Sequence, residues 1–136
     1  MLLSLGDAFD LDTFKQIVDI DDEDAQEFSA TIVFDYFNQA EETFRAMDAA
    51  LERSDLLGLS QLGEFFKGIS AALGLLRVRD DSARIQQYGR RMDDDGTFDL
   101  DEGICVDRLL EWVGQLKSNY AEAEQALRSY FSQFEE

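Results

Sequence analysis

The sequence predicts an all-α protein, an antiparallel four-helix bundle with an additional short N-terminal helix. Apolar residues recur at alternating spacings of three and four over long stretches, and no stretch alternates apolar and polar residues with a period of two. The chain contains no proline, as expected where helices run without interruption. Its 136 residues, 45% of them hydrophobic, are enough to bury a sizeable core, so we expect one domain over residues 1–136.

A short helix and a long helix are expected first. The short helix runs from about residue 10 to 18, with Asp10 or Asp12 placed to cap its N-terminus. The long helix runs from about residue 24 to 53. Its apolar stripe alternates spacings of four and three and consists of Val33, Phe37, Ala40, Phe44, Met47 and Leu51.

Three further helices complete the predicted bundle. Ser54-Asp55 supplies a turn and a cap before a helix over about 57–76, which is followed by a helix over about 78–92. A polar loop over 93–103 precedes the last helix, whose three-four spacing persists for about four heptads. The inward-facing residues are Leu59, Leu62, Phe66, Ile69, Leu73 and Leu76, then Ile85, Tyr88 and Met92, then Val106, Leu109, Val113, Leu116, Tyr120, Ala123, Leu127, Tyr130 and Phe134.

Charge and composition narrow the possible partners. Thirty acidic against twelve basic residues give a formal charge of -18, which would repel nucleic acid and anionic membranes. No run of about 18 apolar residues predicts a membrane span, and residues 1–5 lack the basic character of a signal peptide. The single Cys105 cannot form an internal disulfide, so we expect a buried thiol and a reducing compartment. These features predict a cytoplasmic protein, with the nucleus as a second location.

The segment 62–74, LGEFFKGISAALG, is the most informative part of the chain. At about 100° per residue, Glu64 points away from the apolar stripe of its helix. Lys67, Gly68 and Ala71 follow Glu64 by three, four and seven positions and share its exposed face. Since Gly68 costs about 1 kcal/mol of helix propensity relative to alanine, we interpret it as allowing another surface to approach. The alternative is an ordinary solvated face that tolerates a glycine.

This segment resembles the signature helix of the histidine-containing phosphotransfer (HPt) proteins, which reads His-x-x-Lys-Gly, then small residues, then Leu-Gly. Residues 9–24, 28–44 and 84–90 are similar to the corresponding helices of the fungal members of that family. Beyond residue 92 only the helical spacing is similar. The resemblance implies a phosphorelay protein in which Gln86 and Arg90 lie beside the phosphoacceptor position.

Two positions depart from the family pattern. Ile69 stands where many members have serine, and the stripe turns it toward the core. Glu64 occupies the phosphoacceptor position, and the chain contains no histidine. A carboxylate is a weak nucleophile, and its single charge only partly matches the about -1.5 to -2 of a phosphoryl group. We therefore expect a non-enzymatic protein that cannot relay phosphate or only partly mimics its phosphorylated state. A natural loss of histidine, a designed variant and a redesigned bundle each fit this substitution.

The resemblance also implies partners, the receiver domains of response regulators and of hybrid sensor histidine kinases. They would dock on an apolar patch beside position 64, and we expect the protein itself to be a monomer. The alternative is that these side chains only pack the first helix onto the bundle. The two interpretations have equal weight for Ile17, whereas docking is favoured for Phe28 and Phe65. The patch would consist of Thr13, Ile17, Ile20, Phe28, Ile32, Phe65, Gly68 and Ala71.

Two rival functions come from other classes. The acidic stretch from Asp93 to Glu102 resembles a calcium-binding EF-hand loop, which would make the chain a calcium-responsive protein. However, Arg91 would stand at the first and most demanding ligand position, so an acidic connecting loop is favoured. The other rival is a purely structural bundle. No phosphate-binding glycine loop, nucleophilic triad or histidine cluster is present, and we expect neither a cofactor nor a metal site.

Overall fold

The computed structural model describes residues 6, 8–21, 27–93, 95–96 and 100–132. Within these ranges the one β feature is an isolated bridge between Phe9 and Leu75. The predicted all-α fold is therefore confirmed. The helices are α1 (Leu11–Val18), α2 (Glu27–Glu52), α3 (Leu56–Ala72), α4 (Leu76–Gly89) and α5 (Glu102–Ser132).

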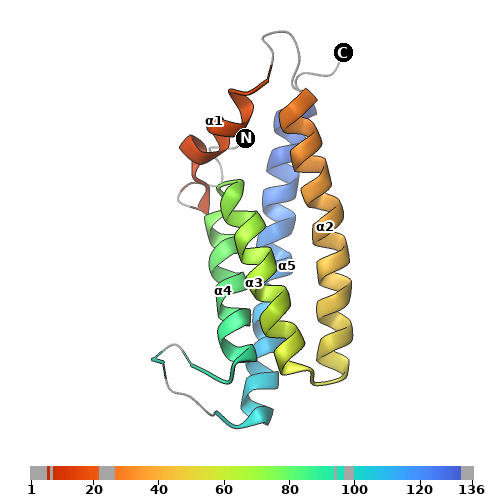
Figure 1. Cartoon of the computed structure of the whole chain (residues 1–136), viewed down its shortest axis with the longest axis vertical. Helices are drawn as coiled ribbons and strands as arrows, with labels where there is room; N and C mark the ends of the chain where they lie inside the picture. The colour runs from red at the N-terminus through yellow and green to blue at the C-terminus, as the bar shows by residue number, and fades with distance from the viewer. Residues whose placement is uncertain (1–5, 7, 22–26, 94, 97–99, 133–136) are drawn as a thin grey trace.

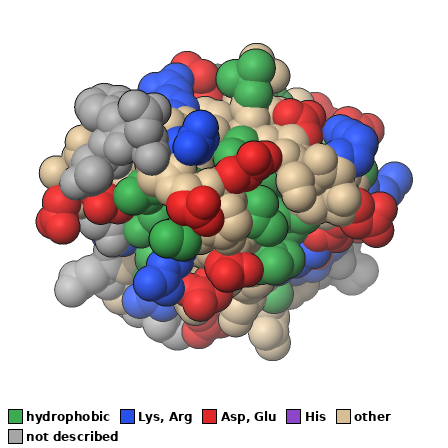
Figure 2. Space-filling view, turned by 90° about the horizontal axis from the view of Figure 1, so that it is seen from below, with side chains coloured by type: hydrophobic (Ala, Val, Ile, Leu, Met, Phe, Trp, Pro, Cys, Tyr) green, Lys and Arg blue, Asp and Glu red, His purple; other side chains and the backbone are tan. Residues whose placement is uncertain are grey.

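The four long helices run alternately up and down the bundle (Figure 1). α3 packs on α4, α4 on α5, α5 on α2 and α2 on α3, which closes the bundle, while α1 packs on α2. α1 lies at the end of the bundle where α3 passes into α4. At the opposite end, acidic, basic and apolar side chains are interspersed (Figure 2). None of the described helices is both long enough and apolar enough to cross a membrane.

The core is rich in aromatic rings. Tyr36 stacks on Phe66 with ring centroids 5.4 Å apart, and the ring of Phe44 meets that of Tyr120 edge-on at 5.0 Å. Aromatic pairs at these distances add about 0.5–1.5 kcal/mol to the effect of burial alone. The predicted stripes of α2, α3 and α5 supply most of this core. Cys105 is buried, as predicted.

The third helix ends at Ala72, so the prediction that it continues to residue 76 was wrong. The amide of Gly74 donates to the carbonyl of Ala71 at 3.0 Å, and the amide of Leu75 donates to that of Ser70 at 3.0 Å. Gly74 has a φ of +80°, which completes a Schellman C-cap. The apolar spacing continues past the end of α3 because Leu76 is the first residue of α4.

Other boundaries also differ from the prediction. α4 covers Leu76–Gly89 instead of 78–92, because Arg90 caps it and Arg91 has a positive φ of 59°. Met92 therefore lies half-buried beyond α4. α5 begins at Glu102, within the predicted loop. The predicted start of the second helix at residues 24–26 and the predicted core residue Phe134 lie outside the described residues.

Candidate functional site

α3 turns Glu64 toward solvent, as its apolar stripe predicts. Asp55 caps the helix by accepting a hydrogen bond from the amide of Gly58 at 2.9 Å. Leu59 and Phe66 are fully buried, whereas the side chain of Glu64 is 60% exposed. A partner can therefore reach the carboxylate of Glu64 without any rearrangement of the core.

α4 brings two polar side chains to Glu64 and its neighbour Lys67. The guanidinium of Arg90 lies 3.8 Å from the carboxylate of Glu64, and Nζ of Lys67 donates to Oε1 of Gln86 at 2.9 Å. We call these four residues the polar cluster. Two cations and one carboxylate give it a formal charge of +1 in a chain of charge -18. Exposed ion pairs contribute at most about 1 kcal/mol, so this arrangement adds little to the stability of the fold.

Glycines allow α3 and α4 to approach closely enough to form the polar cluster. A Cβ atom at Gly63 would lie 2.7 Å from the carbonyl oxygen of Ser82 and 2.7 Å from the amide nitrogen of Gln86. A Cβ atom at Gly89 would lie 2.7 Å from the carbonyl oxygen of Leu56. Real Cβ atoms do not come this close to backbone atoms, so both contacts require glycine.

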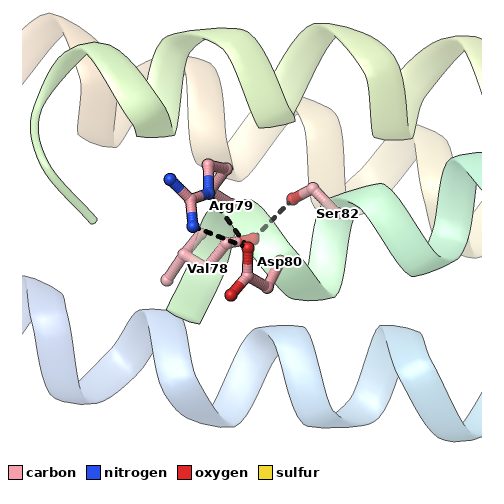
Figure 3. Close-up of polar contacts among 4 residues, drawn as sticks. All are labelled: Val78, Arg79, Asp80 and Ser82. Carbon is pink, nitrogen blue, oxygen red and sulfur yellow. Dashed lines mark hydrogen bonds and ion pairs between the residues drawn. The ribbon is translucent and has the colours of Figure 1, made fainter. Parts of the chain in front are cut away.

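Two polar contacts lie within one turn of α4 (Figure 3). The buried hydroxyl of Ser82 donates to the carbonyl of Val78 at 2.8 Å. Arg79 pairs with Asp80 at 2.9 Å on the exposed side. The backbones of α3 and α4 therefore pack directly against each other at this crossing.

Beside the polar cluster, α1, α2 and α3 enclose a groove of about 430 Å³. Ile17 contributes from α1, Ile32 from α2 and Ile69 from α3. The hydroxyl of Tyr36 forms a hydrogen bond of 2.8 Å with that of Ser70 beneath the groove, and burial raises the pKa of Tyr36 far above its usual value. We call this feature the apolar groove; it is lined by Ile17, Ile32, Asp35, Tyr36, Gln39, Ile69, Ala72 and Leu73.

Exposed aromatic residues lie one helical turn from the lining of the apolar groove. Phe28 is 47% exposed and precedes Ile32 by one turn of α2. Phe65 is 48% exposed and precedes Ile69 by one turn of α3. Two helices thus each present an aromatic residue followed by an isoleucine. Large exposed apolar side chains gathered around a groove are typical of a protein interface.

The remaining residues of the predicted patch differ in their exposure. Thr13 is half-buried, and its hydroxyl donates to the carboxylate of Asp10 at 2.7 Å, so it contributes to the cap of α1. Ile20 follows α1 and is 63% exposed. Gly68 is exposed, and a Cβ atom added there would meet no atom within 4 Å, whereas Ala71 is half-buried. The exposed face that Glu64 shares with Gly68 is therefore only partly continued by Ala71.

Sequence reasoning missed three residues of α2 that line the apolar groove. Asp35 and Gln39 line it from α2, together with Tyr36. These residues follow Ile32 by three, seven and four positions, and this helical spacing could have placed them on the same face. No comparable pattern in the sequence predicts the contacts of Gly63 and Gly89, because a glycine does not indicate which backbone segment approaches it.

The loop of the calcium hypothesis is closed by Arg91. Its Nε donates to the carbonyl of Leu100 at 2.8 Å, and the amide of Leu100 donates to the carbonyl of Arg91 at 3.1 Å. Residues 94 and 97–99 of this loop lie outside the described residues. In the part of the chain that the structure describes, no group of three acidic, histidine or cysteine side chains is arranged to hold a metal ion. Calcium binding stays a hypothesis that no observation favours.

Comparison with curated proteins finds relatives that act in phosphorelays. The chain is 40% identical over 123 residues to Multistep phosphorelay regulator 1 of Schizosaccharomyces pombe, covering 90% of this chain and 42% of the relative. It is 40% identical over 89 residues to Phosphorelay intermediate protein YPD1 of Candida albicans, covering 65% of this chain and 47% of the relative. The chain thus spans less than half the length of these curated relatives. No protein-family model matches it.

Comparison with solved structures identifies the fold. The yeast phosphorelay protein YPD1 superimposes with a TM-score of 0.81 at 25% identity, covering 92% of this chain and 95% of the yeast chain. The chain has the HPt fold. The Saccharomyces cerevisiae Ypd1 in complex with the receiver domain of the response regulator Ssk1 matches with a TM-score of 0.82 at 26% identity, over 92% of this chain and 95% of that one. The HPt protein MtHPt2 of Medicago truncatula shares the fold alone, at 19% identity and a TM-score of 0.62, over 98% of this chain and 88% of its own.

Proposed function

We propose that this chain is an HPt-family docking protein of a two-component phosphorelay, with its phosphoacceptor histidine replaced by Glu64. It binds receiver domains of response regulators and of hybrid sensor histidine kinases. The observation that carries the proposal is the exposed Glu64 within the polar cluster, on a fold whose yeast counterpart has been crystallised with a receiver domain. The same proposal treats the chain as one domain over residues 1–136.

The chemistry of Glu64 separates this protein from a phosphate carrier. A histidine nitrogen can accept a phosphoryl group and return it, but this chain has no histidine. A carboxylate is a weak nucleophile, and no described base lies beside Glu64 to activate it. Its single negative charge makes the protein at most a partial mimic of a phosphorylated carrier. Docking without phosphotransfer is the activity that these residues support.

Most of the docking energy should come from apolar contacts. Truncating an aromatic residue that is a hot spot of an interface costs about 2 kcal/mol or more. The exposed ion pair of Arg90 and Glu64 can contribute at most about 1 kcal/mol. Phe28 and Phe65, each one helical turn from a residue that lines the apolar groove, are therefore the expected anchors, and the polar cluster adjusts the affinity.

Titration against one receiver domain tests the proposal. We expect Phe65→Ala or Phe28→Ala to weaken binding at least tenfold with helix content unchanged, and Glu64→Gln to change it severalfold at most. Leu110→Ala is a matched control, since Leu110 is a similarly exposed apolar residue on α5. A larger loss from Glu64→Gln than from either aromatic variant would show that the carboxylate is the anchor. Absence of binding below ~100 μM would favour a purely structural bundle.

A further inference from the structure

A second groove, of about 420 Å³, lies between α4 and α5 and has no part in the proposed function. α4 lines it with residues at positions 77 and 81, and α5 with residues at positions 111, 112, 115 and 119. Its volume lies in the range of about 300–1,000 Å³ that is typical of ligand sites. The α4–α5 groove, as we call it, is lined by Arg77, Asp81, Glu111, Trp112, Gln115 and Asn119.

The wall of the α4–α5 groove contains a buried carboxylate. Asp81 is only 5% exposed, and Nδ2 of the buried Asn119 donates to its Oδ2 at 2.6 Å. Among the described residues, this is the one hydrogen bond that the Asp81 side chain receives, while Arg77 and Arg84 act on it from farther away. Burial therefore raises the pKa of Asp81. A buried carboxylate whose hydrogen bond comes from a neutral amide is costly, and a bound cation would remove much of that cost.

An aromatic ring stands in the same groove. Trp112 lines it, and the guanidinium of Arg84 lies 5.0 Å from the centroid of the Trp112 ring. Arg84 thus already makes a cation–π contact with this ring, and a bound cation would compete with Arg84 for it. A carboxylate next to a tryptophan ring is the combination that recognises guanidinium and alkylammonium groups.

The charge of the whole protein favours the same ligand class. Within the lining, Glu111 pairs with Arg108 at 3.2 Å and Arg77 lies 4.0 Å from Glu122, which leaves Asp81 as the carboxylate without an ion pair at such a distance. The formal charge of -18 attracts cations to the whole surface. A cationic group entering the groove would therefore gain from the field of the protein as well as from direct contacts.

We propose that the α4–α5 groove binds a guanidinium or alkylammonium group. The carboxylate of Asp81 accepts hydrogen bonds from the cation, the ring of Trp112 packs against it, and the amide oxygen of Gln115 offers a further acceptor. The cation comes either from a basic segment of a partner protein or from a free small molecule. Because the polar cluster lies at the α3–α4 face, this site works whether or not the proposed receiver docking holds.

The fluorescence of Trp112 provides a direct readout, because it is the one tryptophan of the sequence. The intact chain is titrated with N-acetyl-arginine amide and, at the same ionic strength, with the uncharged citrulline analogue. We expect the arginine compound to give a saturable change with a dissociation constant on the order of 1 mM. The citrulline compound should give none. Equal responses to both compounds, or no saturable response to arginine, would overturn the proposal.

Two variants that each remove one negative charge test whether the carboxylate of Asp81 binds the cation. Asp81→Asn should weaken arginine binding at least fivefold. Asp80→Asn should change it less than twofold, since Asp80 is exposed and pairs with Arg79 (Figure 3). Equal effects of the two variants would mean that only the overall charge matters, and the site would have to be abandoned. A peptide of alternating arginine and glycine that binds tighter than the amide assigns the site to a partner segment, and equal affinity assigns it to a small cation.

Discussion

Replacing Gly63 by alanine should destabilise the fold, whereas the same replacement at Gly68 should stabilise it. A methyl group at Gly63 would meet backbone atoms of Ser82 and Gln86 at 2.7 Å, so α3 and α4 must move apart. Overpacking of this kind costs about 1–3 kcal/mol. A methyl group at Gly68 meets no atom within 4 Å, and alanine gains about 1 kcal/mol of helix propensity there.

Urea denaturation of the two variants measures this contrast. Since Gly63→Ala also gains helix propensity, its net loss of stability should be at most about 2 kcal/mol, and the two variants should differ by the overpacking cost of about 1–3 kcal/mol in free energy of unfolding. Gly63→Ala should also perturb the Lys67 ammonium resonance, because Gln86 moves away from Nζ. If both variants were equally stable, the close crossing of α3 and α4 would be refuted. If Gly68→Ala stabilised the fold and left receiver binding unchanged, Gly68 would not face the partner.

Two further predictions concern buried polar groups. Tyr36→Phe should lower the free energy of unfolding by about 1–3 kcal/mol in urea denaturation, because it leaves the buried hydroxyl of Ser70 without its partner. Adding Ser70→Ala should recover part of this loss. Equal losses in the single and the double variant would refute the coupling between the two hydroxyls. The raised pKa of Asp81 means that its ionised form is disfavoured in the folded state, so Asp81→Asn should raise the thermal midpoint at neutral pH. That advantage should shrink as the pH falls through the raised pKa toward the unfolded value of 3.8, and a pH-independent difference would contradict it.

The helical fold could be predicted because spacing alone separates helix from strand. Val33, Phe37 and Ala40 recur with helical period, and the structure buries all three. The end of α3 was missed for a physical reason: Leu76 keeps the apolar spacing even though the Gly74 C-cap has already reversed the chain. A glycine after an apolar helix signals a C-cap, and this signal should have outweighed the periodicity.

The candidate site was only partly visible in the sequence. Helical geometry placed Lys67 beside Glu64 on one exposed face, but the nearness of Gln86 and Arg90 came from the family resemblance alone. The contact between Asp81 and Asn119 joins residues 38 positions apart on different helices, and no local pattern predicts it. Such pairings depend on the rotation and separation of packed helices, which the glycines of α3 and α4 help to set.

Phosphotransfer from a labelled receiver domain tests the central claim most directly. The wild-type chain and Glu64→His are each incubated with a phosphorylated receiver, and the label on each is measured together with its helix content. The wild-type chain should stay unlabelled because it has no imidazole, whereas folded Glu64→His should carry acid-labile phosphate supported by Lys67, Gln86 and Arg90. Labelling of the wild-type chain, or a folded Glu64→His that binds the receiver but takes up no label, would contradict the assignment of position 64.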